Sequence, residues 1–75
     1  MAPQAIITVR KLSRPDPVAP SAEYRAVTTY KWDDGSSDQF GNWYGRTREA
    51  AISNAMIAVR NVAPKIDVLV KGAAA

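Results

Sequence analysis

The side chains most able to do chemistry gather in one stretch, residues 30–47, which reads YKWDDGSSDQFGNWYGRT. This stretch holds five of the six aromatic residues and three of the seven acidic ones, close to the DDG sequence. Three interpretations compete: a metal-binding loop, a platform on which nucleic-acid bases stack, and a hairpin that places its rings in a core.

The spacing of the acids argues against a metal-binding loop. A calcium loop needs acids at alternate positions, then a glycine, then a distant bidentate glutamate. The DDGSSD sequence at 33–38 has its acids elsewhere, and the chain contains neither Cys nor His as an alternative ligand. We predict no metal site and no cofactor, with Asp33 and Asp34 as solvated turn residues.

The groups needed for catalysis are also missing. The five serines have no histidine partner, and no lysine lies at a recognisable motif spacing from them. Carboxylate catalysis needs paired acids in a cleft, whereas these acids fall mostly in turns and at element ends. We therefore predict that the protein is not an enzyme and has no catalytic residues.

Length and composition favour one small, self-associating domain. A chain of 75 residues buries only about 60% of its unfolded surface, and such scaffolds often depend on disulfides, metals or oligomerisation. Without Cys or His, oligomerisation remains, so a homo-oligomer is expected. No segment approaches the roughly 20 apolar residues of a membrane span. We expect a cytoplasmic protein, and its net charge of +3 permits binding to an anionic polymer.

The elements that must position these residues follow from hydrophobic periodicity. Strands are expected at 5–12, 23–32, 37–44 and 65–72, and a helix at 48–62. A proline-rich loop at 13–22, expected to be extended, joins the first two strands, and 73–75 form a frayed tail. This is an α+β fold of order β-β-β-α-β: an antiparallel three-stranded meander, a fourth strand, and one helix on one face of the sheet.

The helix carries its own signals. Thr47 is a typical N-cap, Glu49 suits the first turn, and Pro64 ends the helix. Its apolar residues recur every three or four positions and form one stripe, made of Ile52, Ala55, Met56, Val59 and Val62. Ile57 lies well off this stripe, which favours self-association.

The hairpin loop decides which aromatic residues face the helix. Residues 24, 26, 28, 30 and 32 alternate with Arg25, Val27, Thr29 and Lys31, so the two sets lie on opposite faces. A three-residue loop, 33–35 with Gly35 left-handed, places Phe40, Asn42 and Tyr44 with the aromatic set. A two-residue loop at 34–35 places Gly41 and Trp43 there instead. We prefer the three-residue loop because it gathers more aromatic surface on one face.

With that loop, the second face carries Val27 and Trp43 beside Arg25 and Lys31. We predict that this open face mediates homodimerisation and binds a protein partner, with Val27, Trp43 and Ile57 as the partner or dimer surface. With the two-residue loop, Phe40 and Tyr44 would take these places. The alternative function is nucleic-acid binding, with basic groups on phosphates and rings on bases. Its candidate residues are Arg10, Lys11, Arg14, Arg25, Lys31, Arg46 and Arg48.

The order of elements resembles the first half of the ribonuclease H-like fold, with AIITV, YRAVTTY, FGNWYGRTREAAISNAMIAVRN and IDVLV in the family's order. That family's metal-binding acids are not retained at matching positions, so nuclease activity is not implied. YKWDDG and TREAAISNAMIAV are similar to a reduced version of the fold, the HicB-type antitoxins, which have a tyrosine-rich strand, a DG turn and a Thr-capped helix. This resemblance implies a non-catalytic, dimerising binding module.

Overall fold

A computed structural model describes residues 3–72, and its elements follow the expected order. The strands are β1 (Gln4–Lys11), β2 (Tyr24–Lys31), β3 (Ser37–Gly45) and β4 (Asp67–Gly72), and the helix is α1 (Arg48–Val62). The expected helix has the observed bounds, and each strand is shifted by two residues at most. The tail expected at 73–75 lies outside the described residues.

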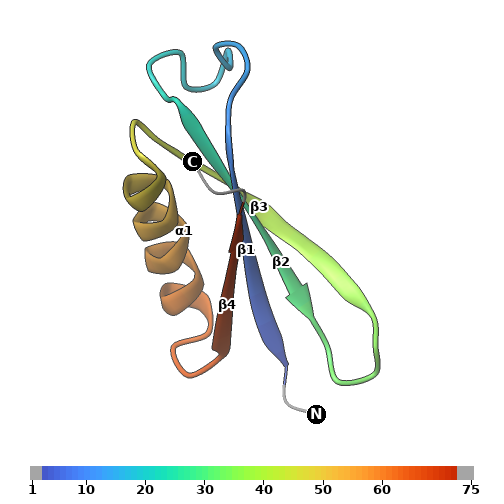
Figure 1. Ribbon diagram of the computed structural model, residues 1–75. Coiled ribbons are helices and arrows are strands. Elements are labelled where there is room, and N and C mark those ends of the chain that lie inside the picture. The colour runs from blue at the N-terminus through green and yellow to red at the C-terminus, as the bar shows by residue number, and fades with distance from the viewer. Residues whose placement is uncertain (1–2, 73–75) are drawn as a thin grey trace.

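The four strands form one mixed sheet in the order β3-β2-β1-β4. β1 pairs antiparallel with β2, β2 pairs antiparallel with β3, and β4 runs parallel to β1 on its other side. The chain crosses from β3 to β4 through α1, which covers one face of the sheet (Figure 1). The α+β class, with its three-stranded meander and one packed helix, is confirmed.

The core lies between α1 and the sheet. The alternation of β1 buries Ala5, Ile7 and Val9, while α1 buries Ala51, Ala55 and Val59. Small alanine side chains let the helix backbone approach the strands closely.

The expected helix stripe is partly wrong. Its centre is rotated toward Ala51, so Ile52 and Met56 are only half-buried at its margin. Val62 is 62% exposed, because the last turn of α1 extends over an opening at the end of the sheet.

The hairpin between β2 and β3 has the preferred three-residue loop. The Trp32 N–H donates to the Ser36 carbonyl at 2.8 Å, and the Gly35 N–H donates to the Trp32 carbonyl at 3.1 Å. Gly35 has φ of +92°, a conformation that costs glycine little. Asp34 accepts bonds from both the N–H and the hydroxyl of Ser36, which hold the pKa of its carboxyl below the usual value.

A β-bulge in β3 reverses the sheet faces on which the residues after it lie, compared with those expected from the three-residue loop. Pairing passes from Thr28–Gly41 to Thr29–Gln39, so Phe40 is an extra residue in β3. Beyond the bulge, Trp43 pairs with Ala26 on the helix face, and Asn42 and Tyr44 lie on the open face. The predicted placement of Trp43 on the open face is therefore wrong, although the loop is right. Phe40 keeps its expected face and packs against the rings of Tyr30 and Trp43, with centroids 4.9 and 5.1 Å away.

The proline-rich loop at 13–22 is folded into turns and is not extended as expected. Asp16 organises it, because its carboxylate accepts the Val18 N–H at 2.8 Å and its carbonyl accepts the Ala19 N–H at 3.0 Å. A further turn bond joins the Ala22 N–H to the Ala19 carbonyl. Proline removes backbone donors but leaves such turns available to the residues between prolines.

Candidate functional site

The sheet face turned away from α1 carries many polar and basic side chains that the packing of the core does not require. We call this the open face. The strand registers arrange it in four rows across β3, β2, β1 and β4: Tyr44-Arg25-Arg10, then Asn42-Val27-Thr8-Lys71, then Gln39-Thr29-Ile6-Leu69, then Ser37-Lys31-Gln4-Asp67. Aliphatic residues occupy its middle, and basic residues lie toward both ends.

Two arginines stand directly opposite each other on this face. Arg10 of β1 pairs with Arg25 of β2 in an antiparallel register, which places their Cβ atoms about 4.5–5.5 Å apart. Like charges at this spacing destabilise a sheet. The Arg25 Nε is buried and has no hydrogen-bond partner within residues 3–72. A bound anion between the two guanidinium groups would reduce the repulsion and give the Arg25 Nε a hydrogen-bond acceptor.

Tyr44 completes this end of the open face. It pairs with Arg25, and its hydroxyl donates to the Asp16 carboxylate of the proline-rich loop at 3.1 Å. Burial, together with this bond to Asp16 and its charge, raises the pKa of the Tyr44 hydroxyl, while Arg25 acts in the opposite direction. The ring is thereby held beside the two arginines.

The structure brings together only some of the basic residues predicted from the sequence. Arg10, Arg25 and Lys31 lie on the open face, the last of them in the row at its far end. Lys11 falls on the opposite face of β1, and Arg14 lies in the proline-rich loop. Arg46 lies between β3 and α1, and Arg48 begins the helix.

The sequence reasoning missed Lys71 of the open face and placed Tyr44 there only with the two-residue loop. Lys71 joins it because the parallel pairing of β4 sets it beside Thr8. Its period-two spacing from Asp67 and Leu69 was visible in the sequence, but the neighbour of β4 was not. Tyr44 lies on the open face with the three-residue loop because of the bulge at Phe40, which could not be read from the residues.

The predicted partner surface of Val27, Trp43 and Ile57 is not one surface. Val27 lies in the middle of the open face, opposite Asn42. Trp43 packs against the core beneath α1. Ile57 is 58% exposed on the helix, which covers the other side of the sheet.

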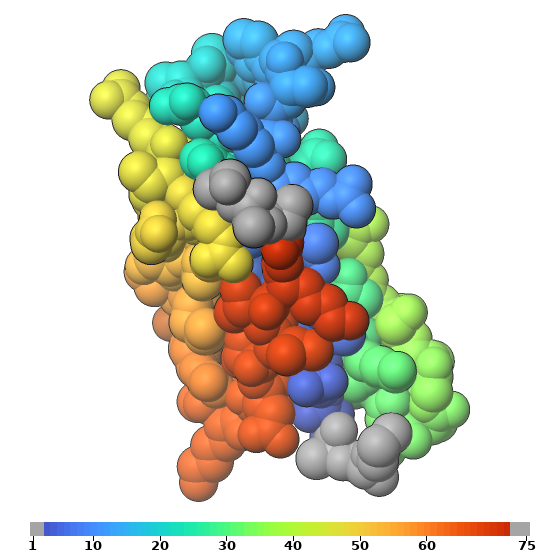
Figure 2. All heavy atoms as spheres, in the orientation of Figure 1, coloured from blue at the N-terminus to red at the C-terminus, as the bar shows by residue number. Residues whose placement is uncertain are grey.

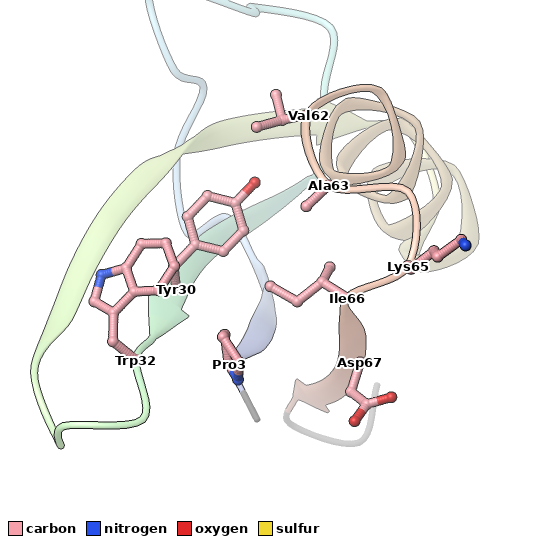
Figure 3. Close-up of a pocket in the computed structure, with 8 residues that line it drawn as sticks. All are labelled: Pro3, Tyr30, Trp32, Val62, Ala63, Lys65, Ile66 and Asp67. Atoms are coloured by element: carbon pink, nitrogen blue, oxygen red, sulfur yellow. The ribbon is translucent and has the colours of Figure 1, made fainter. Parts of the chain in front are cut away.

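An apolar cavity of about 410 Å³ opens at one end of the helix–sheet layer (Figure 3). It is lined by Pro3, Tyr30, Trp32, Val62, Ala63, Lys65, Ile66 and Asp67. Tyr30 is only 7% exposed; its hydroxyl points toward the last turn of α1 and has no partner in the described part of the chain. Burial raises the pKa of this hydroxyl.

Residues 3–72 contain neither a cluster of metal ligands nor a membrane-spanning helix. No three side chains of His, Cys, Asp or Glu lie close enough together to hold a metal ion. In the same residues, no helix has the length and apolar character needed to cross a membrane.

Comparison of the chain with protein-family models, with curated proteins and with solved structures gives no match. The resemblance to ribonuclease H-like and HicB-type domains therefore stays a prediction. The site itself must carry any statement about function.

Proposed function

We propose that the protein is a small, non-catalytic, cytoplasmic binding module whose open face binds the phosphate backbone of a nucleic acid. The observation that carries this proposal is the Arg10–Arg25 pair, two like charges set face to face beside Tyr44. Phosphate oxygens accept charge-assisted hydrogen bonds from guanidinium groups and would neutralise both. The Tyr44 ring beside them offers a surface for stacking a base or sugar.

The charge of the open face favours an anionic partner over a second copy of the same face. Arg10, Arg25, Lys31 and Lys71 lie on it against one strand carboxylate, Asp67, with Asp16 at its rim. A face-to-face dimer would oppose basic groups and bury them, which costs free energy unless each is paired. With Trp43 beneath the helix, such a dimer also lacks the aromatic anchor that the sequence suggested.

The test is a fluorescence anisotropy titration with a labelled oligonucleotide, in single- and double-stranded form, at about 50 and 200 mM salt. Arg10→Ala and Arg25→Ala should each weaken binding at low salt and reduce the salt slope by about one unit. Arg46→Ala is the matched control, because Arg46 is exposed outside the open face and should keep the wild-type slope. Absence of binding at low salt, or equal losses in all three variants, would refute the proposal.

A second candidate function is supported by the apolar cavity. Its volume of about 410 Å³ falls within the range of about 300–1,000 Å³ found for ligand pockets, and Trp32 and Tyr30 line it. A protein partner could insert an aliphatic or aromatic side chain there. Ala63→Trp should fill the cavity and block uptake of a hydrophobic dye, whereas Ile57→Ser, away from the cavity, should not. Equal dye binding by Ala63→Trp and wild type would exclude this use of the cavity.

A further inference from the structure

β4 is an edge strand and lies at the end of the sheet opposite β3. β4 bonds to β1 on one side, and no described strand pairs with its other side. In Figure 2 residues 67–72 lie at the surface of the molecule, between α1 and β1. Leu69, at the middle of the strand, is 39% exposed. Natural proteins usually cover, shorten or charge such edges, since a free edge accepts a further strand.

The residues of β4 define how a second copy would fit this edge. In an antiparallel pair, residues directly opposite each other lie on the same face of the sheet. Asp67, Leu69 and Lys71 lie on the open face, whereas Val68 and Val70 lie on the helix face. A two-fold pairing that keeps both faces continuous must therefore be centred on a residue. Centring on Leu69 pairs residues 67–71 of the two strands and centring on Val70 pairs residues 68–72, so these two registers overlap equally and more than any other.

That register is also the one that pairs the charges. With Leu69 opposite Leu69 of the second copy, Asp67 stands opposite Lys71, and by symmetry Lys71 stands opposite Asp67. Val68 meets Val70 on the other face. Centring on Val68 or Val70 would instead set Leu69 against Asp67 or against Lys71. Only the Leu69 register makes the strand complementary to itself in both charge and hydrophobicity.

We propose that the protein forms a two-fold dimer through antiparallel pairing of β4 with β4 of a second copy, centred on Leu69. The interface is isologous, as expected for a two-fold dimer. Two four-stranded sheets join into one, with both helices on one side and both open faces on the other. This dimer does not depend on the proposed binding of nucleic acid, although it would present two Arg10–Arg25 pairs on one continuous surface.

The test uses sedimentation velocity from about 10 µM to about 1 mM, because a single strand pair with exposed ion pairs gives a modest affinity. Wild type should show a concentration-dependent dimer. Asp67→Lys and Lys71→Asp should each weaken association by about tenfold or more, since each variant turns two attractive pairs into two repulsive ones. The double variant, Asp67→Lys with Lys71→Asp, should restore association to near the wild-type level.

Three results would contradict the β4–β4 dimer. A wild-type monomer at every concentration would overturn it, as would single variants that associate like wild type. Single variants that dissociate without recovery in the double variant would also overturn it, because the register would be wrong. Circular dichroism should show that all variants are folded, and both substituted positions are exposed.

A cross-linking variant tests the register without changing charge. The chain has no cysteine, so Leu69→Cys introduces a single thiol. Residues facing each other across an antiparallel pair have Cα atoms about 4.5–5.5 Å apart, within the range that a disulfide spans. Mild oxidation should therefore link two copies rapidly through residue 69. Thr29→Cys, on the same face but in an interior strand, is the control and should link slowly; equal rates for the two variants would contradict the pairing.

Discussion

Thr28 is a buried residue whose hydroxyl has no hydrogen-bond partner among residues 3–72. It lies in β2 on the helix face, opposite Gly41 and next to the bulge. A buried hydroxyl without a partner lowers the free energy of unfolding by about 1–3 kcal/mol, because it loses its hydrogen bonds to water on folding and gains none in return.

The first prediction is that Thr28→Val raises the free energy of unfolding by about 1 kcal/mol, because valine keeps the shape and removes the unpaired hydroxyl. Urea denaturation should show a higher midpoint with an unchanged slope. The control is Thr29→Val, on the open face, which should change stability by less than about 0.5 kcal/mol. A destabilised Thr28→Val would mean that the hydroxyl has a bonding partner after all.

Two tyrosines should make the protein sensitive to alkaline pH. The pKa values of Tyr30 and Tyr44 are raised in the folded state, mainly by burial, and in Tyr44 also by the bond to Asp16. A raised pKa means that the folded state holds the proton more tightly than the unfolded state does. The contribution to stability is complete below the unfolded pKa near 10 and is lost as pH rises through the folded values.

The second prediction is that the free energy of unfolding falls as the pH rises above about 10. The doubly substituted Tyr30→Phe, Tyr44→Phe protein should show a flatter dependence, measured by urea denaturation at stepped pH. Tyr24→Phe is the control for loss of a hydroxyl and should retain the wild-type dependence. Equal slopes in all three proteins would show that these two hydroxyls are not responsible.

The helix α1 contains two valines in opposite environments. Val59 is fully buried between the helix and the sheet, whereas Val62, one turn later, is 62% exposed. The third prediction is that Val59→Ala lowers the free energy of unfolding by about 2 kcal/mol, through lost burial and a cavity. Val62→Ala, the same chemical change in the same helix, should cost less than about 0.5 kcal/mol. Similar melting temperatures for the two variants would mean that a different side of α1 faces the sheet.

The junction of β3 and α1 depends on a glycine. A Cβ atom at Gly45 would lie 2.5 Å from the Ala51 backbone nitrogen, and Glu23 donates its N–H to the Gly45 carbonyl at 3.0 Å. The fourth prediction is that Gly45→Ala costs about 1–3 kcal/mol, because strand and helix must move apart. Gly35→Ala tests the other use of glycine: nothing lies near its added Cβ, so only the positive φ should cost stability, by about 1 kcal/mol. Thermal melts of the two variants would separate these causes.

The positions of the helix and strands along the chain were more predictable than the sheet face on which each side chain lies. The N-cap at Thr47, which accepts the Ala50 N–H at 3.1 Å, and the loop at Gly35 follow from local rules that need only neighbouring residues. The bulge at Phe40 follows from packing of that ring between Tyr30 and Trp43, which no local pattern encodes. One extra residue exchanged the faces of Trp43 and Tyr44, and with them the composition of the candidate site.

At the scale of the whole molecule, helix and sheet divide the chain into two surfaces of different chemistry. The layer between them holds the aromatic residues Tyr30, Phe40 and Trp43 and opens at one end into the apolar cavity. The open face carries the arginine pair, and the β4 edge carries a charge pattern complementary to itself. Parallel pairing of β1 with β4 could not be assigned from the period of either strand alone, so the position of Lys71 and the free edge emerged only from the structure.

The most direct measurement of the central claim is a titration of isotope-labelled protein with an oligonucleotide, followed by NMR. The side-chain Nε–H signals of Arg10 and Arg25 report on the open face, and the indole N–H signals of Trp32 and Trp43 report on the helix side. The proposed function predicts progressive shifts of both arginine signals, reduced at higher salt, while both indole signals stay in place. Shifts of the indole signals without any change at Arg10 and Arg25 would contradict it.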